Sequence, residues 1–160
     1  MNSTLSYKIV SIDKLQERLK HWRALGDTVV FTNGCFDILH VGHVTVLAHC
    51  RELGQHVVVG LNSDASVKKL KGESRPINQQ ANRALVLAAL ESVDAVVVFE
   101  EETPLKLIEE VKPNVLVKGG DYQQHQIVGA DFVNANRGKV VMVPFIEGES
   151  TTDILERLQN

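Results

Sequence analysis

The chain has 160 residues, 44% of them hydrophobic and 23% charged, and a net charge of −3. This size and composition are typical of a single globular domain, and the small negative charge argues against binding to nucleic acid or to an anionic membrane. No apolar stretch approaches the roughly 20 residues that span a bilayer, and the opening MNSTLSYKIV lacks the pattern of a signal peptide. Cys35 and Cys50 form no CxxC pair, which favours a reducing cytoplasmic location over a disulfide framework.

The first expected element is an amphipathic helix within residues 11–25, followed by Gly26 as a stop signal. Its apolar residues recur at helical spacing between charged ones: Ile12, Leu15, Leu19 and Trp22. We expect residues 1–27 to form a helical extension that packs on the domain.

Five short apolar runs follow, each rich in β-branched residues. They span residues 28–33, 56–62, 94–99, 114–119 and 139–145. Such nearly continuous apolar runs are typical of strands covered on both faces, as in a parallel sheet. Because helical patterns separate them, they predict one α/β domain over residues 1–160. The expected architecture is Rossmann-like and doubly wound, with a five-stranded parallel sheet in the order 3-2-1-4-5.

Three connecting segments have helical patterns, at residues 41–53, 78–93 and 103–111. In the third, we expect Thr103 as the N-cap and Pro104 as the first helical residue. A last helical pattern follows Ser150. Residues 63–77 are basic and polar and contain glycine and proline, so we expect a long irregular loop there.

Polar clusters come directly after four of the apolar runs. They are NGCFDILHVGH (33–43), NSD (62–64), KGGDY (118–122) and EGESTT (147–152). Parallel strands bring these clusters to one edge of the sheet, and doubly wound folds bind ligands beyond this edge, where the strand order reverses. Neither the GxGxxG dinucleotide fingerprint nor the GxxxxGK[ST] P-loop is present, so the sequence predicts neither of those nucleotide sites.

His40 and His43 stand out because they lie three residues apart at a predicted helix start. Residues at this spacing share a helix face, and the first turn offers backbone N–H groups and the positive end of the helix dipole. Two imidazoles there can donate hydrogen bonds to phosphate, and Gly42 permits its close approach. The alternatives are ordinary surface or core histidines, or a zinc site with Cys35 or Cys50. No convincing four-ligand spacing is present, so we expect no metal site built by the protein.

Other features have ordinary explanations when taken alone. The GESTT stretch can be only a helix cap, Lys118 a solvated lysine, and the charges of residues 68–75 a solvated loop. The chain could also be a nucleotide-binding module without catalysis. Such a module is expected to have lost a motif histidine or the closing hydroxyl groups, and all are present, so the converging clusters favour an enzyme.

The stretch GCFDILHVGH resembles the G-x-F-D-x-x-H-x-G-H core of the cytidylyltransferase branch of the HxGH nucleotidyltransferase superfamily. Nearly the whole chain, about residues 8–158, is similar to the adenylyltransferases that make ADP-heptose for lipopolysaccharide. The similar stretches include VGLNSDASVKKLKGESRPIN, LVKGGDY, IVGADFV and GESTT.

The resemblance implies transfer of AMP from ATP to D-glycero-β-D-manno-heptose 1-phosphate, with release of pyrophosphate and with Mg²⁺ as cofactor. Positioning and electrostatic stabilisation of phosphate charge are expected to carry the reaction. A homodimer and a separate or fused heptose kinase are the implied partners. The alternative is a cytidylyltransferase acting on glycerol 3-phosphate or a similar small phosphorylated alcohol. Relatives that use CTP often carry an arginine where this chain has Phe145, which weakens that alternative.

The resemblance also implies roles for single residues. His40 and His43 match the motif histidines and would hold the triphosphate, with Lys118 as a third catalytic residue. Further nucleotide-binding positions are Cys35 and Phe36, through backbone groups, and Gly119, Ser150, Thr151 and Thr152. Positions expected to bind substrate or phosphate are Asn33, Asp37, Lys71, Arg83 and Asp121, with a mainly structural role at the turn for Asp37. Glu149 would oppose phosphate by like charge unless it points away or meets Mg²⁺.

Overall fold

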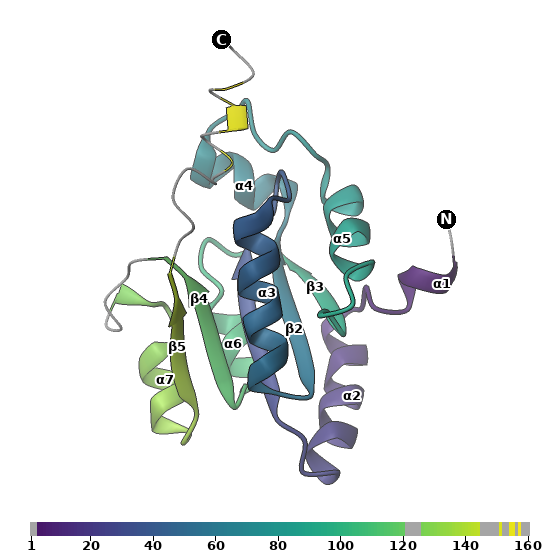
Figure 1. Ribbon diagram of the computed structural model, residues 1–160, viewed down its shortest axis with the longest axis vertical. Coiled ribbons are helices and arrows are strands. Elements are labelled where there is room, and N and C mark those ends of the chain that lie inside the picture. Colours follow the sequence, from purple (N-terminus) through teal and green to yellow (C-terminus); the bar gives the residue numbers. More distant parts are fainter. Residues whose placement is uncertain (1–2, 121–125, 145–150, 152–153, 156, 158–160) are drawn as a thin grey trace.

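The structure is a computed structural model that describes residues 3–120, 126–144, 151, 154–155 and 157 (Figure 1). The strands are β1 (Val29–Gly34), β2 (His56–Asn62), β3 (Ala95–Phe99), β4 (Val115–Gly119) and β5 (Lys139–Val143). The helices are α1 (Ser3–Ser6), α2 (Ile12–Ala24), α3 (Val41–Leu53), α4 (Asp64–Lys71), α5 (Gln80–Ala88), α6 (Leu105–Val111) and α7 (Ala130–Ala135).

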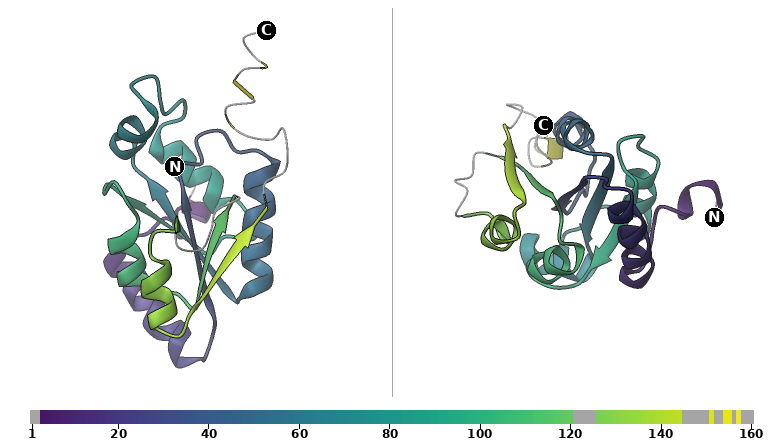
Figure 2. Two further views of the ribbon diagram at one scale, coloured as in Figure 1. Left: turned by 90° about the vertical axis from the view of Figure 1, so that its left-hand side faces the viewer. Right: turned by 90° about the horizontal axis from the view of Figure 1, so that it is seen from below.

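The five strands form one parallel sheet in the order β3-β2-β1-β4-β5. The predicted α/β class and strand order are confirmed. The order reverses beside β1, which pairs with β2 along Val29–Gly34 and with β4 at Val30 and Phe31. Helix α3 lies on one side of the sheet, and α2, α6 and α7 lie on the other (Figure 2). The carboxyl ends of the strands therefore share one edge, with the reversal point between β1 and β4.

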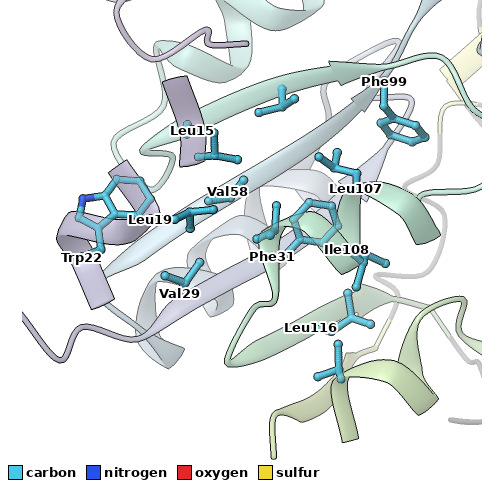
Figure 3. Close-up of a cluster of buried hydrophobic side chains, with 14 of the residues drawn as sticks. Leu15, Leu19, Trp22, Val29, Phe31, Val58, Phe99, Leu107, Ile108 and Leu116 are labelled. Carbon is cyan, nitrogen blue, oxygen red and sulfur yellow. The ribbon is translucent and has the colours of Figure 1, made fainter. Parts of the chain in front are cut away.

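Side chains on the two faces of the sheet fill two separate cores. One core lies under α2, α6 and α7 and contains Phe31, which is fully buried (Figure 3). The other lies under α3 and α5 and contains Val30, Leu47 and Leu87. Because consecutive residues of β1 enter opposite cores, both faces of the sheet are buried, which explains the nearly continuous apolar runs.

Helix α2 follows the predicted amphipathic pattern. The Ser11 hydroxyl accepts the backbone N–H of Lys14 at 3.4 Å, and the chain leaves the helix at Gly26, whose φ is +79°. The buried residues of the helix are Leu15, Leu19 and Trp22. Their packing fixes α2 on the same face of the sheet as α6.

The prediction of an irregular loop over residues 63–77 is wrong for its first half, where Asp64–Lys71 form helix α4. The Ser63 hydroxyl accepts the Ser66 N–H at 3.1 Å and caps this helix, and Val67 is fully buried. The helix ends at Gly72, whose φ of +96° suits glycine. The basic residues that suggested a loop lie on the exposed side of a capped helix.

One cap prediction needs correction, and one helix is additional. Helix α6 has Pro104, not Thr103, in the cap position, because the Pro104 carbonyl accepts the N–H of Ile108 at 2.9 Å. Helix α7, which follows Gly129, is an additional helix that the sequence did not predict. The predicted last helix falls largely outside the described residues, although four of its positions have helical backbone: Thr151, Ile154, Leu155 and Arg157. In the described part of the chain, no helix is long and apolar enough to cross a membrane.

Candidate active site

The turn between β1 and α3 carries the paired histidines. After Gly34, Phe36 adopts a left-handed backbone conformation with φ of +46°, which is strained for an aromatic residue. Its buried ring lies 4.9 Å from the ring of His43, measured between centroids. A Cβ atom at Gly34 would lie 3.1 Å from the Phe36 ring, so glycine leaves this ring room. The turn therefore places Phe36 against the second motif histidine.

His40 and His43 come together at the start of α3. Their ring centroids lie 3.8 Å apart, and the His40 carbonyl accepts the backbone N–H of His43 at 3.0 Å. Burial, with a smaller contribution from His40, lowers the pKa of His43 to about 4, although the Ile38 carbonyl opposes this change. His43 is therefore a neutral imidazole at pH 7, and the Ile38 carbonyl is an acceptor for its one ring N–H.

The N-terminal turn of α3 adds a further preference for anions. The first N–H groups of a helix have no intrahelical acceptor, and the helix dipole contributes positive potential there. Helix α3 has 13 residues and no acidic residue in its first turn. Together with the two histidines, this helix start suits phosphate oxygens. Phosphate binding by His40 and His43 stays a prediction.

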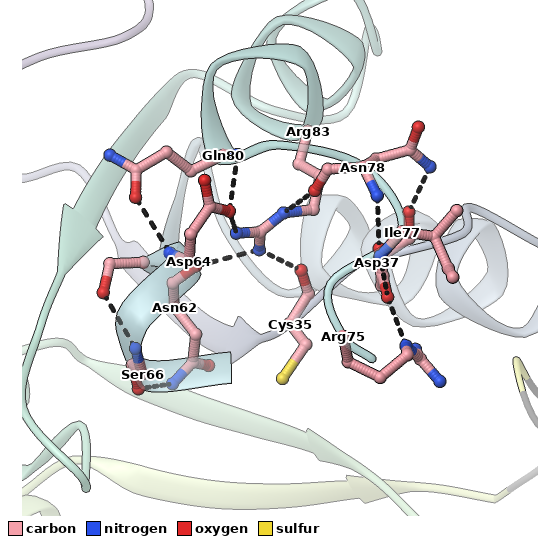
Figure 4. A network of polar contacts seen from close by, with 11 residues as sticks. Cys35, Asp37, Asn62, Asp64, Ser66, Arg75, Ile77, Asn78, Gln80 and Arg83 are labelled. Carbon is pink, nitrogen blue, oxygen red and sulfur yellow. Dashed lines mark hydrogen bonds and ion pairs between the residues drawn. The ribbon is translucent and has the colours of Figure 1, made fainter. Parts of the chain in front are cut away.

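Asp37 ties the same turn to the segment that leads into α5 (Figure 4). Its carboxylate accepts the backbone N–H groups of Ile77 and Asn78 at 3.0 and 2.9 Å and the Nε–H of Arg75 at 2.5 Å. Burial alone would raise the pKa of Asp37, but these backbone groups and Arg75 hold it below its ordinary value. These contacts support the structural role expected for Asp37.

Arg83 lies on α5 and is only 2% exposed. Its guanidinium donates four hydrogen bonds within the protein. The acceptors are the carbonyl oxygens of Asn78, Cys35 and Asn62 and the carboxylate of Asp64, at 2.6 to 2.8 Å. Arg83 therefore joins the ends of β1 and β2 to α4 and α5. The sequence predicts contact with phosphate or substrate, whereas the described contacts are with the protein itself.

Lys118 at the end of β4 lies beside Asn33 at the end of β1, at the reversal point of the sheet. Its Nζ is 3.3 Å from Oδ1 and 3.4 Å from the carbonyl oxygen of Asn33. Burial lowers the pKa of Lys118, with a small opposing effect of Cys35. Both residues line a pocket of about 210 Å³. Its other walls come from Pro104, Gln126, Ile127 and Val128.

Positive charge gathers around Cys35. Burial raises the pKa of the Cys35 thiol, and the charges of Lys71, Arg83 and Arg75 partly oppose that rise. Lys71, which the sequence places in a loop, lies in the last turn of α4 and is exposed. The charge of Asp37 adds to the rise, so the thiol is protonated at pH 7.

Glycine is required at the end of β4. A Cβ atom on Gly119 would lie 2.8 Å from a methyl carbon of Val46, so only glycine lets the strand end approach α3 this closely.

Four other predicted site residues are Asp121, Ser150, Thr151 and Thr152, and of these the structure describes only Thr151. Asp121, Ser150 and Thr152 are not described, nor are Phe145 and Glu149, and Thr151 is half-buried with helical backbone.

Several residues of this site were missed by the sequence analysis: Asp64, Arg75, Asn78 and Gln80. Asp64 and Gln80 bond each other and Asp64 also accepts from Arg83, whereas Arg75 and Asn78 bond Asp37. A signal existed for Asp64, because it belongs to the NSD cluster after β2. The others act through tertiary contacts that no local pattern reveals.

The described residues offer no cage for a metal ion. Among them, no group of three or more histidine, cysteine or carboxylate side chains could hold one. The carboxylates of Asp37 and Asp64 are already occupied by Arg75 and Arg83. Mg²⁺ commonly binds through substrate phosphates and water. The described part of the site therefore fits Mg²⁺ carried by a triphosphate better than Mg²⁺ held by the protein.

The sequence of residues 31–157, which contains the turn, Arg83 and Lys118, matches the cytidylyltransferase-like family. The chain belongs to this family. The assignment of the sequence to a nucleotidyltransferase family is thereby confirmed, and the paired histidines of this cytidylyltransferase-like domain lie where its sheet reverses.

Three bifunctional HldE proteins resemble this cytidylyltransferase-like chain. Identity is 52% over 153 residues for Magnetococcus marinus, 53% over 152 for Wolinella succinogenes and 57% over 147 for Nitrobacter hamburgensis. The matches cover 96%, 95% and 92% of this chain, but 31%, 31% and 30% of the relatives. The chain thus spans about a third of their length.

Two solved structures share the fold. A lipopolysaccharide core biosynthesis protein from Thermoplasma volcanium is 29% identical with a TM-score of 0.60, and the match covers 76% of this chain and 98% of that one. A pantoate-beta-alanine ligase from Francisella tularensis has a TM-score of 0.64 at 18% identity, covering 85% of this chain and 66% of that one. The second likeness shows the fold alone.

Proposed function

We propose that this cytidylyltransferase-like chain transfers AMP from ATP to D-glycero-β-D-manno-heptose 1-phosphate, giving ADP-heptose and pyrophosphate. The observation that carries the proposal is the pairing of His40 and His43, 3.8 Å apart, at the start of α3. Identity of 52% or more to the HldE relatives over nearly the whole chain supports it. The name of the Thermoplasma volcanium protein, a lipopolysaccharide core biosynthesis protein, is consistent with a role in lipopolysaccharide synthesis.

We place the triphosphate at the first turn of α3. There His40 and His43 would donate hydrogen bonds to phosphate oxygens as negative charge moves toward the departing pyrophosphate. A bound triphosphate would favour the protonated imidazole of His43, whose second ring N–H is not engaged by the Ile38 carbonyl. The ring of Phe36 packs against His43, so this donor is held in place before the reaction. Donors that need no rearrangement in the transition state lower the barrier most effectively. Neither histidine is required to transfer a proton.

We place the sugar 1-phosphate in the pocket beside Asn33 and Lys118. These two side chains lie on the sheet face opposite α3, because Phe31 and Leu116, two residues earlier on the same strands, belong to the core under α2, α6 and α7. An in-line displacement requires the attacking and leaving oxygens on opposite sides of the phosphorus. A triphosphate on the α3 side and a sugar phosphate on the other side satisfy this requirement.

Lys118 would hold the attacking phosphate in this arrangement. Its ammonium group lies beside the oxygens of Asn33 and has no carboxylate partner among the described residues. Burial, which lowers the pKa of Lys118, also strengthens its attraction to a phosphate that enters the pocket. Mg²⁺ bound to the triphosphate would supply further stabilisation of phosphate charge.

The partners are also part of the proposal. The relatives are named bifunctional and are about three times as long as the matched region, which supports a second activity elsewhere in such proteins. We infer that this second activity is the kinase that supplies heptose 1-phosphate. A cytoplasmic reaction and a homodimer also stay predictions, and light scattering on the purified chain tests the second.

The decisive experiment measures pyrophosphate release with Mg²⁺. ATP and CTP are each combined with D-glycero-β-D-manno-heptose 1-phosphate and with glycerol 3-phosphate. We expect release only from ATP with the heptose. Release only from CTP with glycerol 3-phosphate would identify the alternative cytidylyltransferase, and release from no combination would contradict the proposal.

A further inference from the structure

Helices α4 and α5 cap each other at their first residues. The Asp64 carboxylate accepts the backbone N–H of Gln80 at 2.8 Å, and the Gln80 side-chain oxygen accepts the backbone N–H of Asp64 at 2.9 Å (Figure 4). Gln79, the N-cap residue of α5, makes no side-chain cap bond of its own. One reciprocal pair of hydrogen bonds therefore holds the two helix starts together.

The same carboxylate oxygen of Asp64 also fixes Arg83. It accepts Nη2–H of the guanidinium at 2.8 Å, and a cation as buried as Arg83 needs such a partner. The Nη1 atom of Arg83 then donates to the carbonyl oxygens of Cys35 and Asn62, at 2.6 and 2.8 Å. Through Arg83, the position of Asp64 determines where the Cys35 carbonyl is held.

The Cys35 carbonyl belongs to the peptide plane that enters Phe36. Because a peptide unit is planar, holding that carbonyl also fixes the N–H of Phe36. Phe36 has a strained φ of +46°, which persists only when its surroundings enforce it. Its ring packs on His43 with centroids 4.9 Å apart. A chain of direct contacts thus runs from the two helix starts to a motif histidine.

We propose that Asp64 and Gln80 are positioning residues for the nucleotidyl transfer. Their reciprocal bonds fix α4 against α5, so that Arg83 holds the Cys35–Phe36 peptide and, through Phe36, the ring of His43. The inference rests on the proposed function, and neither residue is placed in contact with substrate. The alignment of His43 matters even though Asp64 and Gln80 do not contact substrate, because a displacement of about 1 Å at reacting groups can lower a rate by about 100-fold.

Gln80 is the residue to change, because its side chain is half-buried and lies outside both apolar cores. Gln80→Ala removes the acceptor for the Asp64 N–H without changing Arg83 itself. Gln79→Ala is the matched control, since it removes the same side chain from an exposed neighbour without a cap bond. Gln80→Glu restores an oxygen acceptor, and a carboxylate is favourable at the start of α4.

Two readouts are needed, and only one of them depends on turnover. The first is the rate at which 5,5′-dithiobis(2-nitrobenzoate) modifies Cys35 without nucleotide, because Cys50 is fully buried and the half-buried Cys35 reports on the turn. The second is kcat and KM for ATP with the heptose 1-phosphate. For Gln80→Ala we expect a several-fold faster thiol reaction and a kcat about 5- to 10-fold lower at an unchanged KM.

The control variants decide the interpretation. Gln79→Ala should match the wild type in both readouts, and Gln80→Glu should recover most of the lost kcat. A Gln80→Ala protein with a wild-type thiol rate, or with a faster thiol and an unchanged kcat, would overturn the inference. If the wild type turns over no sugar phosphate, the proposed function fails, and the thiol rates alone still show whether the pair holds the turn.

Discussion

Asp37 and Asn78 bind each other through both their backbones and their side chains. The Asp37 carboxylate accepts the Asn78 backbone N–H at 2.9 Å, and the Asp37 carbonyl accepts the Asn78 side-chain amide at 2.7 Å. These bonds therefore join the turn after β1 to the segment before α5 at the edge of the site. A single carboxylate supplies most of the connection.

Asp37→Ala should lower the free energy of unfolding by roughly 2 to 4 kcal/mol, because Arg75 and two backbone N–H groups lose their acceptor. Asp37→Asn keeps one acceptor oxygen and should cost less. Urea denaturation at pH 7 measures both effects. Glu73→Ala, at a side chain that is 92% exposed, is the control and should change little. Equal stabilities of the Asp37→Ala and Glu73→Ala proteins would contradict the assigned role.

His40→Ala should lower kcat by about 100-fold or more, the scale of losing one donor to the transition state. The helix should persist, because the His40 side chain makes no cap hydrogen bond to α3. Steady-state pyrophosphate release measures the loss, and circular dichroism checks the fold. His49→Ala, at an exposed position on the same helix, should retain the wild-type kcat. An active His40→Ala enzyme would remove His40 from the mechanism.

The stability of the protein should depend on pH through His43. Its pKa is about 4 in the folded protein and 6.5 ordinarily, so between these values the unfolded chain binds a proton that the folded protein does not. This group therefore lowers the free energy of unfolding as the pH falls from about 6.5 to 4, by up to about 3 kcal/mol. Urea titrations at several pH values should show a shallower dependence for His43→Gln. An equal pH dependence of the free energy of unfolding in the two proteins would show that the pKa of His43 does not change on folding.

Lys118→Met should raise thermal stability and lower activity. Burial lowers the pKa of Lys118, which means that burying its charge costs free energy in the folded protein, and an apolar side chain of similar length removes that cost. Loss of the charge should reduce kcat/KM for the sugar phosphate by roughly 10- to 100-fold. Calorimetry and steady-state kinetics measure the two effects. Lys69→Met, at an exposed position on α4, should alter neither property.

Much of the fold could be predicted because its signals are local. β-Branched apolar runs predict the five strands, and their alternation with helical patterns predicts a parallel sheet. Helix α4 was not predicted, because its three lysines and its polar residues have the composition of a loop. What decides that segment is the Ser63 cap and the burial of Val67, which depends on the neighbouring strand.

The candidate site likewise has a part that local patterns predict and a part that they do not. The spacing of His40 and His43 is local, so the sequence indicates their shared helix start. Arg83 could be recognised as important, but not that its guanidinium would bind three carbonyl oxygens and a carboxylate of the protein. Gln79 and Gln80 are adjacent glutamines at the start of α5, and no local pattern shows that Gln80 is the one that bonds Asp64. Such contacts are properties of the assembled fold.

The contact between Lys118 and Asn33 joins residues 85 positions apart. On the ribosome, β1, β2 and β3 can pair as they emerge, but the pocket beside Asn33 and Lys118 has no second wall until β4 is synthesised and docks against β1. Closing so long a segment is slow compared with local pairing. A substrate that binds this pocket stabilises only the completed sheet, so it favours molecules in which β4 has docked against β1 over molecules in which it has not.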